Sequence, residues 1–157
     1  MDLSMMRPGE EGHVIDLVKA VFDAVVAPGY TQEGIDEFYR FANVASLSER
    51  SKTDHFTVLA RKDRHLIGII EIRDFSHVSM FFVGTEYQGR GVGRALFDEA
   101  VRRIEPEKRN IRELTVNSSL NAVPAYEKLG FAAQGAEQCV NGIIFVPMKL
   151  TVDREPL

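Results

Sequence analysis

Several features are scarce or missing in this chain of 157 residues, and each absence excludes a class of protein. The chain has no apolar run of about 18 residues, the length that a membrane-spanning helix needs, and its first residues show no basic and apolar export signal. Its single cysteine, Cys139, cannot form an intramolecular disulfide, which is typical of proteins in a reducing compartment. We therefore expect a cytoplasmic protein with no membrane partner.

The chain also lacks a surplus of basic residues. Its formal net charge is -4, whereas proteins that bind nucleic acid usually carry excess positive charge on one face, so no DNA or RNA partner is expected. The His, Cys and Asp residues form no cluster with metal-ligand spacing, so no metal is expected. With 45% hydrophobic and 27% charged residues, the sequence predicts one globular domain over residues 1–157, with a core at about 3–150 and a tail at 151–157.

The most informative feature that is present is a run of alternating glycines, Gly89, Gly91 and Gly93. It follows the apolar stretch 78–83 and precedes a helical pattern, so the sequence predicts a strand, a glycine turn and a helix N-terminus. The first amide groups of a helix have no intrahelical partner and carry partial positive charge, and glycine lets a phosphate approach them. Together with Arg90 and Arg94, this turn predicts a site for a diphosphate.

Families that use such a turn differ in the residues around it. A P-loop has Lys and then Ser or Thr after its last glycine, but Arg94 and Ala95 follow Gly93, which excludes a P-loop. A Rossmann fingerprint needs a small residue where Arg94 stands and usually opens the first βαβ unit, so a nicotinamide or flavin enzyme is a remote alternative. A short glycine pattern can also be an ordinary turn, and its context has to decide.

Apolar spacing along the chain predicts the element order β-α-α-β-β-β-α-β-α-β-β. Residues 46–54 are polar and without periodicity, which predicts a loop, and Asn141-Gly142 predicts a type I′ turn. This order indicates an α/β fold with a mostly antiparallel mixed sheet of about seven strands and helices on both faces. We expect strands at about 3–7, 56–60, 66–72, 77–83, 111–116, 131–140 and 143–150, and helices at about 10–27, 31–42, 92–104 and 118–129.

Two motifs resemble those of the GNAT superfamily of acetyl-coenzyme A-dependent N-acetyltransferases. The pattern Gln-x-x-Gly-x-Gly at 88–93 is similar to the family's acetyl-coenzyme A signature. About 33 residues downstream, the segment Ala125 to Phe131, with the sequence Ala-Tyr-Glu-Lys-Leu-Gly-Phe, is similar to a block that follows the fifth strand in these enzymes. The resemblance covers residues 3–150 and extends to the order of elements.

The resemblance implies acetyl-coenzyme A as cosubstrate and a gap between the fourth and fifth strands that holds its pantetheine. It implies that the main chain of Phe81, Phe82 and Val83 lines this arm, and at least one of these phenylalanines should also pack in the core. Many family members carry an asparagine where this chain has Ser119, so Asn117 or Asn121 could replace that polar contact. The residues implied to hold the pyrophosphate are Gln88, Gly89, Arg90, Gly91, Val92, Gly93 and Arg94.

The resemblance further implies that Tyr126 is the general acid for the departing thiolate, and the alternative is a buried helix tyrosine without a catalytic role. The general base is open. Glu71 lies in an apolar strand, where burial would raise its pKa, but it could simply pair with Arg73. His77 is the second candidate because a histidine titrates near neutral pH. The remaining alternatives are a water chain, Asp74 or Glu86.

The implied function is transfer of an acetyl group from acetyl-coenzyme A to an amine of a small molecule or a protein. A non-catalytic acyl-coenzyme A sensor of the same fold is the alternative, and a homodimer is possible because GNAT domains are often dimers. The acceptor groove would be built from the two N-terminal helices, the loop that follows them and the last hairpin, and these segments carry no signature of one substrate. Acidic residues such as Asp36, Glu37 and Glu71 hint at a cationic amine.

Overall fold

The computed structural model of the chain describes residues 1–104 and 113–151, and within these residues eight strands form one sheet. Neighbouring strands follow the order β1-β2-β3-β4-β5-β8-β6, and β7 also pairs with β8. All pairs are antiparallel except β4 with β5. The strands are β1 (Asp2–Met5), β2 (His55–Lys62), β3 (His65–Arg73), β4 (His77–Val83), β5 (Glu113–Ser118), β6 (Ala132–Ala133), β7 (Gln138–Val140) and β8 (Ile143–Thr151).

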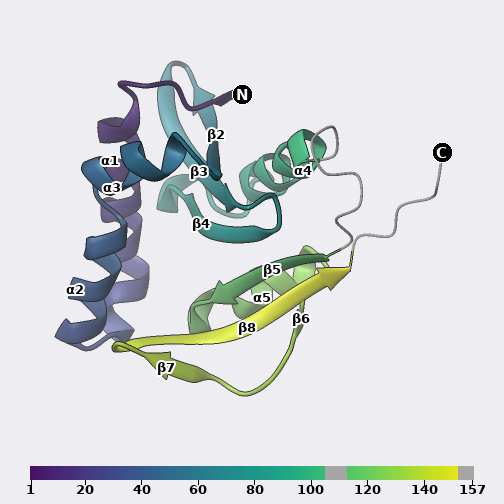
Figure 1. Ribbon diagram of the computed structural model, residues 1–157. Coiled ribbons are helices and arrows are strands. Elements are labelled where there is room, and N and C mark those ends of the chain that lie inside the picture. Colours follow the sequence, from purple (N-terminus) through teal and green to yellow (C-terminus); the bar gives the residue numbers. More distant parts are fainter. Residues whose placement is uncertain (105–112, 152–157) are drawn as a thin grey trace.

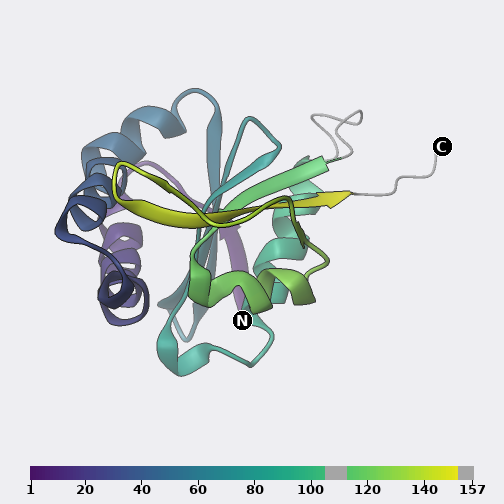
Figure 2. The ribbon, with the colours of Figure 1, turned by 90° about the horizontal axis from the view of Figure 1, so that it is seen from below.

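Helices cover both faces of this sheet, as the sequence predicts. Helices α1 and α3 contact β2, β3 and β4 on one face, and α4 contacts the same strands on the other. Figure 2 shows the N-terminal helices together on one side and the helices of the second half on the other. None of the helices in the described ranges is long and apolar enough to cross a membrane. The helices are α1 (Glu11–Val21), α2 (Gln32–Phe41), α3 (Val44–Ser51), α4 (Val92–Ile104) and α5 (Val123–Lys128).

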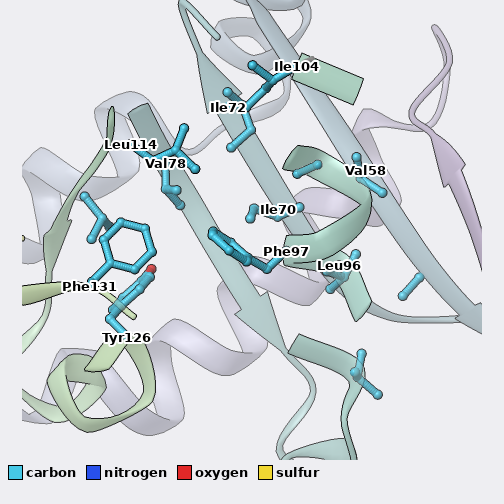
Figure 3. Close-up of a cluster of buried hydrophobic side chains, with 14 of the residues drawn as sticks. Val58, Ile70, Ile72, Val78, Leu96, Phe97, Ile104, Leu114, Tyr126 and Phe131 are labelled. Atoms are coloured by element: carbon cyan, nitrogen blue, oxygen red, sulfur yellow. The ribbon is translucent and has the colours of Figure 1, made fainter. Parts of the chain in front are cut away.

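Side chains of the central strands alternate between the two faces of the sheet, and this divides the core into two clusters. Ile70 and Ile72 of β3 face α4 and join a cluster that includes Leu96 and Phe131, shown in Figure 3. Ile69 points the other way and packs in a second cluster with α1 and α3. Both faces of β3 are therefore buried, because period-two side chains alternate between two helical layers.

The predicted loop at 46–54 is wrong, because most of it belongs to helix α3. The side chain of Asn43 caps this helix by accepting a hydrogen bond from the amide of Ser46 at 2.9 Å. Leu47 is its only buried residue. A helix of 8 residues with one buried side chain shows no apolar periodicity, which is why the sequence pattern missed it.

Two other predicted elements are subdivided. The first helix ends at Val21 and continues as a π-helical turn, η1 (Phe22–Val26), and a 3-10 turn, η2 (Ala27–Gly29). The predicted strand at 131–140 forms two short strands, β6 and β7, and this gives eight strands where about seven were expected.

The predicted helix at 118–129 is shorter than expected: β5 runs to Ser118, and a 3-10 turn, η4 (Leu120–Ala122), precedes α5. The predicted start of β5 at Ile111 and the tail beyond Thr151 lie outside the described residues. Asn141 and Gly142 both have positive φ, 52° and 80°, as a type I′ turn requires.

Candidate active site

Strands β4 and β5 pair only over a short distance and then separate. Their parallel register joins His77 to Thr115 and Val78 to Val116, and it includes no later residue. Figure 1 shows the two strands side by side at their starts and apart toward α1 and α2. Beyond Val78, the edge of β4 that faces β5 therefore has main-chain groups that no neighbouring strand in the described part of the chain satisfies.

A bulge in β4 lies at the point of separation. Ile72 pairs with Val78 and Glu71 pairs with Met80, so Ser79 has no partner on β3. The extra residue reverses the alternation, because Val78 packs in the α4 cluster and Met80 in the cluster beneath α1. Bulges bend a strand and redirect its side chains, and they are common beside active sites.

The gap between these strands opens into a cavity of about 710 Å³. Its lining comes from the glycine turn, β4, the end of β5, the segment 119–129, and the N-terminal elements α1, η1 and α2. Strand β4 contributes every residue from Val78 to Val83. Segments from both halves of the sequence therefore meet in one cavity, at the place where β4 leaves β5.

The glycine turn forms one wall of the cavity. Gly89 and Gly91 have φ of 74° and 85°, values that L side chains rarely adopt, and open space surrounds both. Gln88 fixes the turn to the end of β4, since its Nε2 donates to the carbonyl of Val83 at 2.9 Å. Helix α4 then begins with no acidic residue in its first turn, which leaves its positive end unopposed.

The other residues that the sequence assigns to the pyrophosphate are distributed around this turn. Gln88, Gly89, Gly91, Gly93 and Arg94 line the cavity, whereas Arg90 and Val92 do not. Val92 is buried in the core cluster between α4 and the sheet, and Arg90 is exposed. Gly93 has ordinary φ, and a Cβ there would meet the Phe81 ring at 3.7 Å, which is normal contact.

Phe81 and Phe82 lie on opposite faces of β4. Phe81 packs beside the α4 cluster with its ring edge-on to Tyr126, and Phe82 packs beside the α1 cluster against Phe38. Both phenylalanines are thus partly buried, and Val83 joins Phe81 on its face. All three residues also line the cavity.

Tyr126 of α5 lines the cavity and also belongs to the buried core cluster. It is 8% exposed and lies between two rings, with centroids 6.0 Å from Phe81 and 5.5 Å from Phe131. Figure 3 shows it beside Phe131 at the margin of the cluster. Burial raises the pKa of Tyr126 above its usual value, so the hydroxyl stays protonated at neutral pH and can donate.

Glu71 is completely buried and is held by Arg50. Arg50 Nε donates to Oε2 at 2.8 Å and Nη2 to Oε1 at 3.2 Å, and Ser79 Oγ adds a bond to Oε1 at 2.9 Å. Arg50 comes from α3, the helix that the sequence pattern missed, and it replaces Arg73 as the expected partner. Glu71 does not line the cavity. The geometry gives it the role of anchoring α3 to β3.

His77 lies at the closed end of the β4–β5 gap and is also outside the cavity lining. Its Nδ1 is 2.7 Å from Oγ1 of Thr115. Burial, with the nearby Arg73 and His55 as smaller causes, lowers the pKa of His77 to about 4. The ring is therefore neutral at pH 7. Asp74 and Glu86, the other candidate bases, are exposed and line no part of the cavity.

Asn117, Ser119 and Asn121 all line the cavity, so the structure brings together every candidate for the missing family asparagine. The opposite wall belongs to the N-terminal segments in which the acceptor groove is expected from the sequence, although the sequence assigns no role there to Val25, Val26 or Tyr30, which line the cavity. The sequence signal near these residues is the Pro28-Gly29 pair, which predicts the end of a helix but does not predict the π turn before it. Within residues 1–104 and 113–151, no group of His, Cys, Asp and Glu side chains is arranged to hold a metal ion.

Comparison with known proteins gives the same family at the level of sequence and of fold. A family model described as an acetyltransferase (GNAT) domain matches residues 26–152. An uncharacterized N-acetyltransferase of Methanocaldococcus jannaschii is 34% identical over 70 residues, which are 44% of this chain and 31% of that protein. The chain thus aligns with less than a third of the length of that curated relative.

Two solved structures share the fold over almost their whole length. One is a GCN5-related N-acetyltransferase from Rhodopseudomonas palustris, with a TM-score of 0.79, 22% identity, and coverage of 96% of this chain and 95% of that one. The other is a PaiA N-acetyltransferase from Thermoplasma acidophilum in complex with coenzyme A, with a TM-score of 0.74, 21% identity and coverage of 96% and 99%. Since the family model matches most of the chain and these neighbours share its fold, the chain belongs to the GNAT acetyltransferase family.

Proposed function

We propose that this chain transfers the acetyl group of acetyl-coenzyme A to a primary amine by direct attack in a ternary complex. The observation that carries the proposal is the cavity of about 710 Å³, which joins the glycine turn, the free edge of β4, Tyr126 and the N-terminal helices. A thioester and an amine could meet in such a cavity, because it is continuous between a diphosphate cradle and a separate apolar wall.

The donor half of the cavity suits coenzyme A. The turn at Gly89 and Gly91, the positive end of α4 and Arg94 would hold the diphosphate. The unpaired main-chain groups of β4 beyond Val78 would bind the amides of pantetheine, as an added strand would. The coenzyme A in the related Thermoplasma acidophilum structure supports this assignment.

The proposed reaction needs one proton donor and one route for proton loss. The amine nitrogen attacks the thioester carbonyl carbon, the carbon–nitrogen bond forms and the carbon–sulfur bond breaks. Tyr126 donates its hydroxyl proton to the departing sulfur and regains one from solvent. Cys139 is exposed on β7 and outside the cavity, which favours direct attack over an acetylated cysteine intermediate.

Water is the proposed acceptor of the amine proton. Among the described residues, no carboxylate and no imidazole lines the cavity, and Glu71 is held by Arg50. Of the candidates for the general base that the sequence leaves open, a water chain is the one that remains. An amine that reaches the cavity in its neutral form would then need no enzymatic base before attack, and it would release its proton to solvent afterward.

The proposal is tested by supplying acetyl-coenzyme A with a panel of amines and following thiol release, with mass spectrometry of the acetylated product. Binding of coenzyme A to the same preparation is measured by calorimetry. Amine-dependent thiol release with a matching acetylated product is the expected result. Coenzyme A binding without thiol release across the panel would instead support the non-catalytic sensor.

A further inference from the structure

We infer that the acceptor of this chain is a monoamine with an apolar, ring-sized body, and that polycationic amines are excluded. This inference rests on the proposed function, because it assigns the part of the cavity that the donor would leave free. The wall in question comes from the end of α1, the π turn η1, Tyr30 immediately after η2, and α2. Its members are Val21, Phe22, Val25, Val26, Tyr30 and Phe38.

Stacked aromatic rings make this wall rigid. Phe22 and Phe38 are parallel, with centroids 3.9 Å apart and planes at 9°. Tyr30 meets Phe22 edge-on at 5.6 Å, and Phe82 of β4 meets Phe38 at 6.0 Å. Phe22 is 1% exposed and holds in place the rings of Phe38 and Tyr30, which are only partly buried. These two rings offer a preformed apolar surface, so a flat apolar group can bind without reordering the side chains.

The π turn extends the apolar wall outward. After the end of α1, the chain continues as a π-helical turn from Phe22 to Val26. Val25 and Val26 of this turn line the cavity. Val25 is 37% exposed, although a valine gains nothing from contact with water. Single π turns are frequent at functional sites. Val25 therefore gives the cavity an exposed apolar position beside the aromatic rings, which an apolar part of the acceptor could cover.

The hairpin of β7 and β8 supports this wall from behind. A Cβ on Gly34 of α2 would lie 2.3 Å from the carbonyl oxygen of Gly142. The turn between β7 and β8 is therefore in direct contact with α2. The Tyr30 hydroxyl also donates to the carbonyl of Ile144 at 3.4 Å. Contacts at both places limit how far α2 and Tyr30 can move away to admit a larger or more hydrated acceptor.

The carboxylates that might have bound a polycation are engaged elsewhere. Asp36 accepts from Gln32 at 2.8 Å, Glu37 from Arg40 at 2.7 Å, and Glu71 from Arg50 at 2.8 Å. Asp23 accepts from the Tyr39 hydroxyl. None of these carboxylates lines the cavity, so the hint of a cationic acceptor in the sequence is not supported by their positions.

The charged side chains that line the cavity in the described part of the chain are Arg94 and Lys128, and both are cationic. A spermidine or an aminoglycoside would bring several positive charges to a wall on which none of the described residues supplies a carboxylate as counter-ion. Charges without a partner are costly to bury, and the cost grows as the cavity loses water. A monoamine instead loses its only charge when it becomes the neutral nucleophile.

The test compares phenethylamine with ethylamine, spermidine and kanamycin at one pH, using kcat/KM from thiol release. Phenethylamine is expected to exceed each of the others at least tenfold. Equal or better turnover of spermidine or kanamycin would overturn the inference. Binding of the same amines in the presence of coenzyme A is measured by calorimetry, so selectivity is seen even without turnover. Selective binding of phenethylamine without turnover would preserve the inference and reject the proposed function.

A charge variant sharpens the test. Val25→Asp places a carboxylate on the proposed acceptor wall and should raise the ratio of spermidine to phenethylamine kcat/KM about tenfold. Val44→Asp is the matched control, because Val44 is 48% exposed on α3, lies outside the cavity and undergoes the same change. The control should leave the ratio unchanged. Equal ratios in the two variants, in kcat/KM and in calorimetric binding, would place the acceptor elsewhere.

Discussion

The guanidinium of Arg50 binds the carboxylate of Glu71 through two hydrogen bonds, Nε to Oε2 at 2.8 Å and Nη2 to Oε1 at 3.2 Å. The same guanidinium donates from Nη1 to the carbonyl of Phe41 at 2.6 Å and lies 3.7 Å above the Phe41 ring. One arginine of α3 thus connects the end of α2 to the centre of β3. This relationship explains a buried acid in an apolar strand without assigning it to catalysis.

Arg50→Met should strongly destabilise the fold. It would leave the Glu71 carboxylate buried without its cation, a change that lowers the free energy of unfolding by about 3–5 kcal/mol in comparable pairs. Denaturant unfolding measures the effect, with Arg40→Met as the control because Arg40 pairs with Glu37 at the surface. The double variant Arg50→Met, Glu71→Met should recover part of the stability and retain turnover. A folded but inactive double variant would indicate that Glu71 is the general base after all.

Tyr126→Phe should lower kcat about tenfold or more, since one positioned proton donor contributes roughly 10² to 10⁴ in rate. The change removes one oxygen and keeps both ring contacts, so the unfolding transition should stay near that of the parent. Tyr87→Phe is the control, because Tyr87 lies outside the cavity lining. Unchanged kcat in a saturated assay of Tyr126→Phe would remove this hydroxyl from the mechanism.

Gly91→Ala should weaken coenzyme A binding by roughly tenfold. Space is available for a methyl group, but φ of 85° strains any L side chain by about 1–2 kcal/mol. Relief of that strain would turn the amide groups away from the diphosphate. Gly135→Ala provides the control, since Gly135 has equal space and no positive φ. Calorimetry with coenzyme A compares the two, and equal affinities would show that the turn does not hold the diphosphate.

His77 should make the fold less stable in mild acid. Its pKa is about 4 in the folded chain and about 6.5 when unfolded. Between these values the unfolded chain binds the extra proton, so stability is complete above pH 6.5 and falls as pH decreases toward 4. His77→Gln should reduce this slope in urea unfolding measured from pH 4 to 7. An identical slope in the variant would assign the pH dependence to other groups.

The sequence predicted those parts of the site that depend on local backbone. Gly89 and Gly91 have positive φ, a backbone conformation that favours glycine, so the glycines in the sequence already indicate the turn. The partner of Glu71 could not be predicted in the same way. It lies 21 residues away on a helix with one buried residue, so neither spacing nor periodicity connects the two. The bulge at Ser79 and the π turn at Phe22–Val26 likewise depend on packing between distant segments.

The pH dependence of turnover should follow the pKa of the acceptor amine and not the pKa of a group on the enzyme. Since no carboxylate or imidazole of the described residues lines the cavity, the fraction of neutral amine in solution should set kcat/KM. An alkylamine resembles lysine, with a pKa of about 10.4, whereas an α-amino group has a pKa of about 8. The plateau for phenylalanine amide should therefore begin about two pH units below that for phenethylamine. A plateau at the same pH for both amines would reveal an enzymatic base, and its position would give that group's pKa.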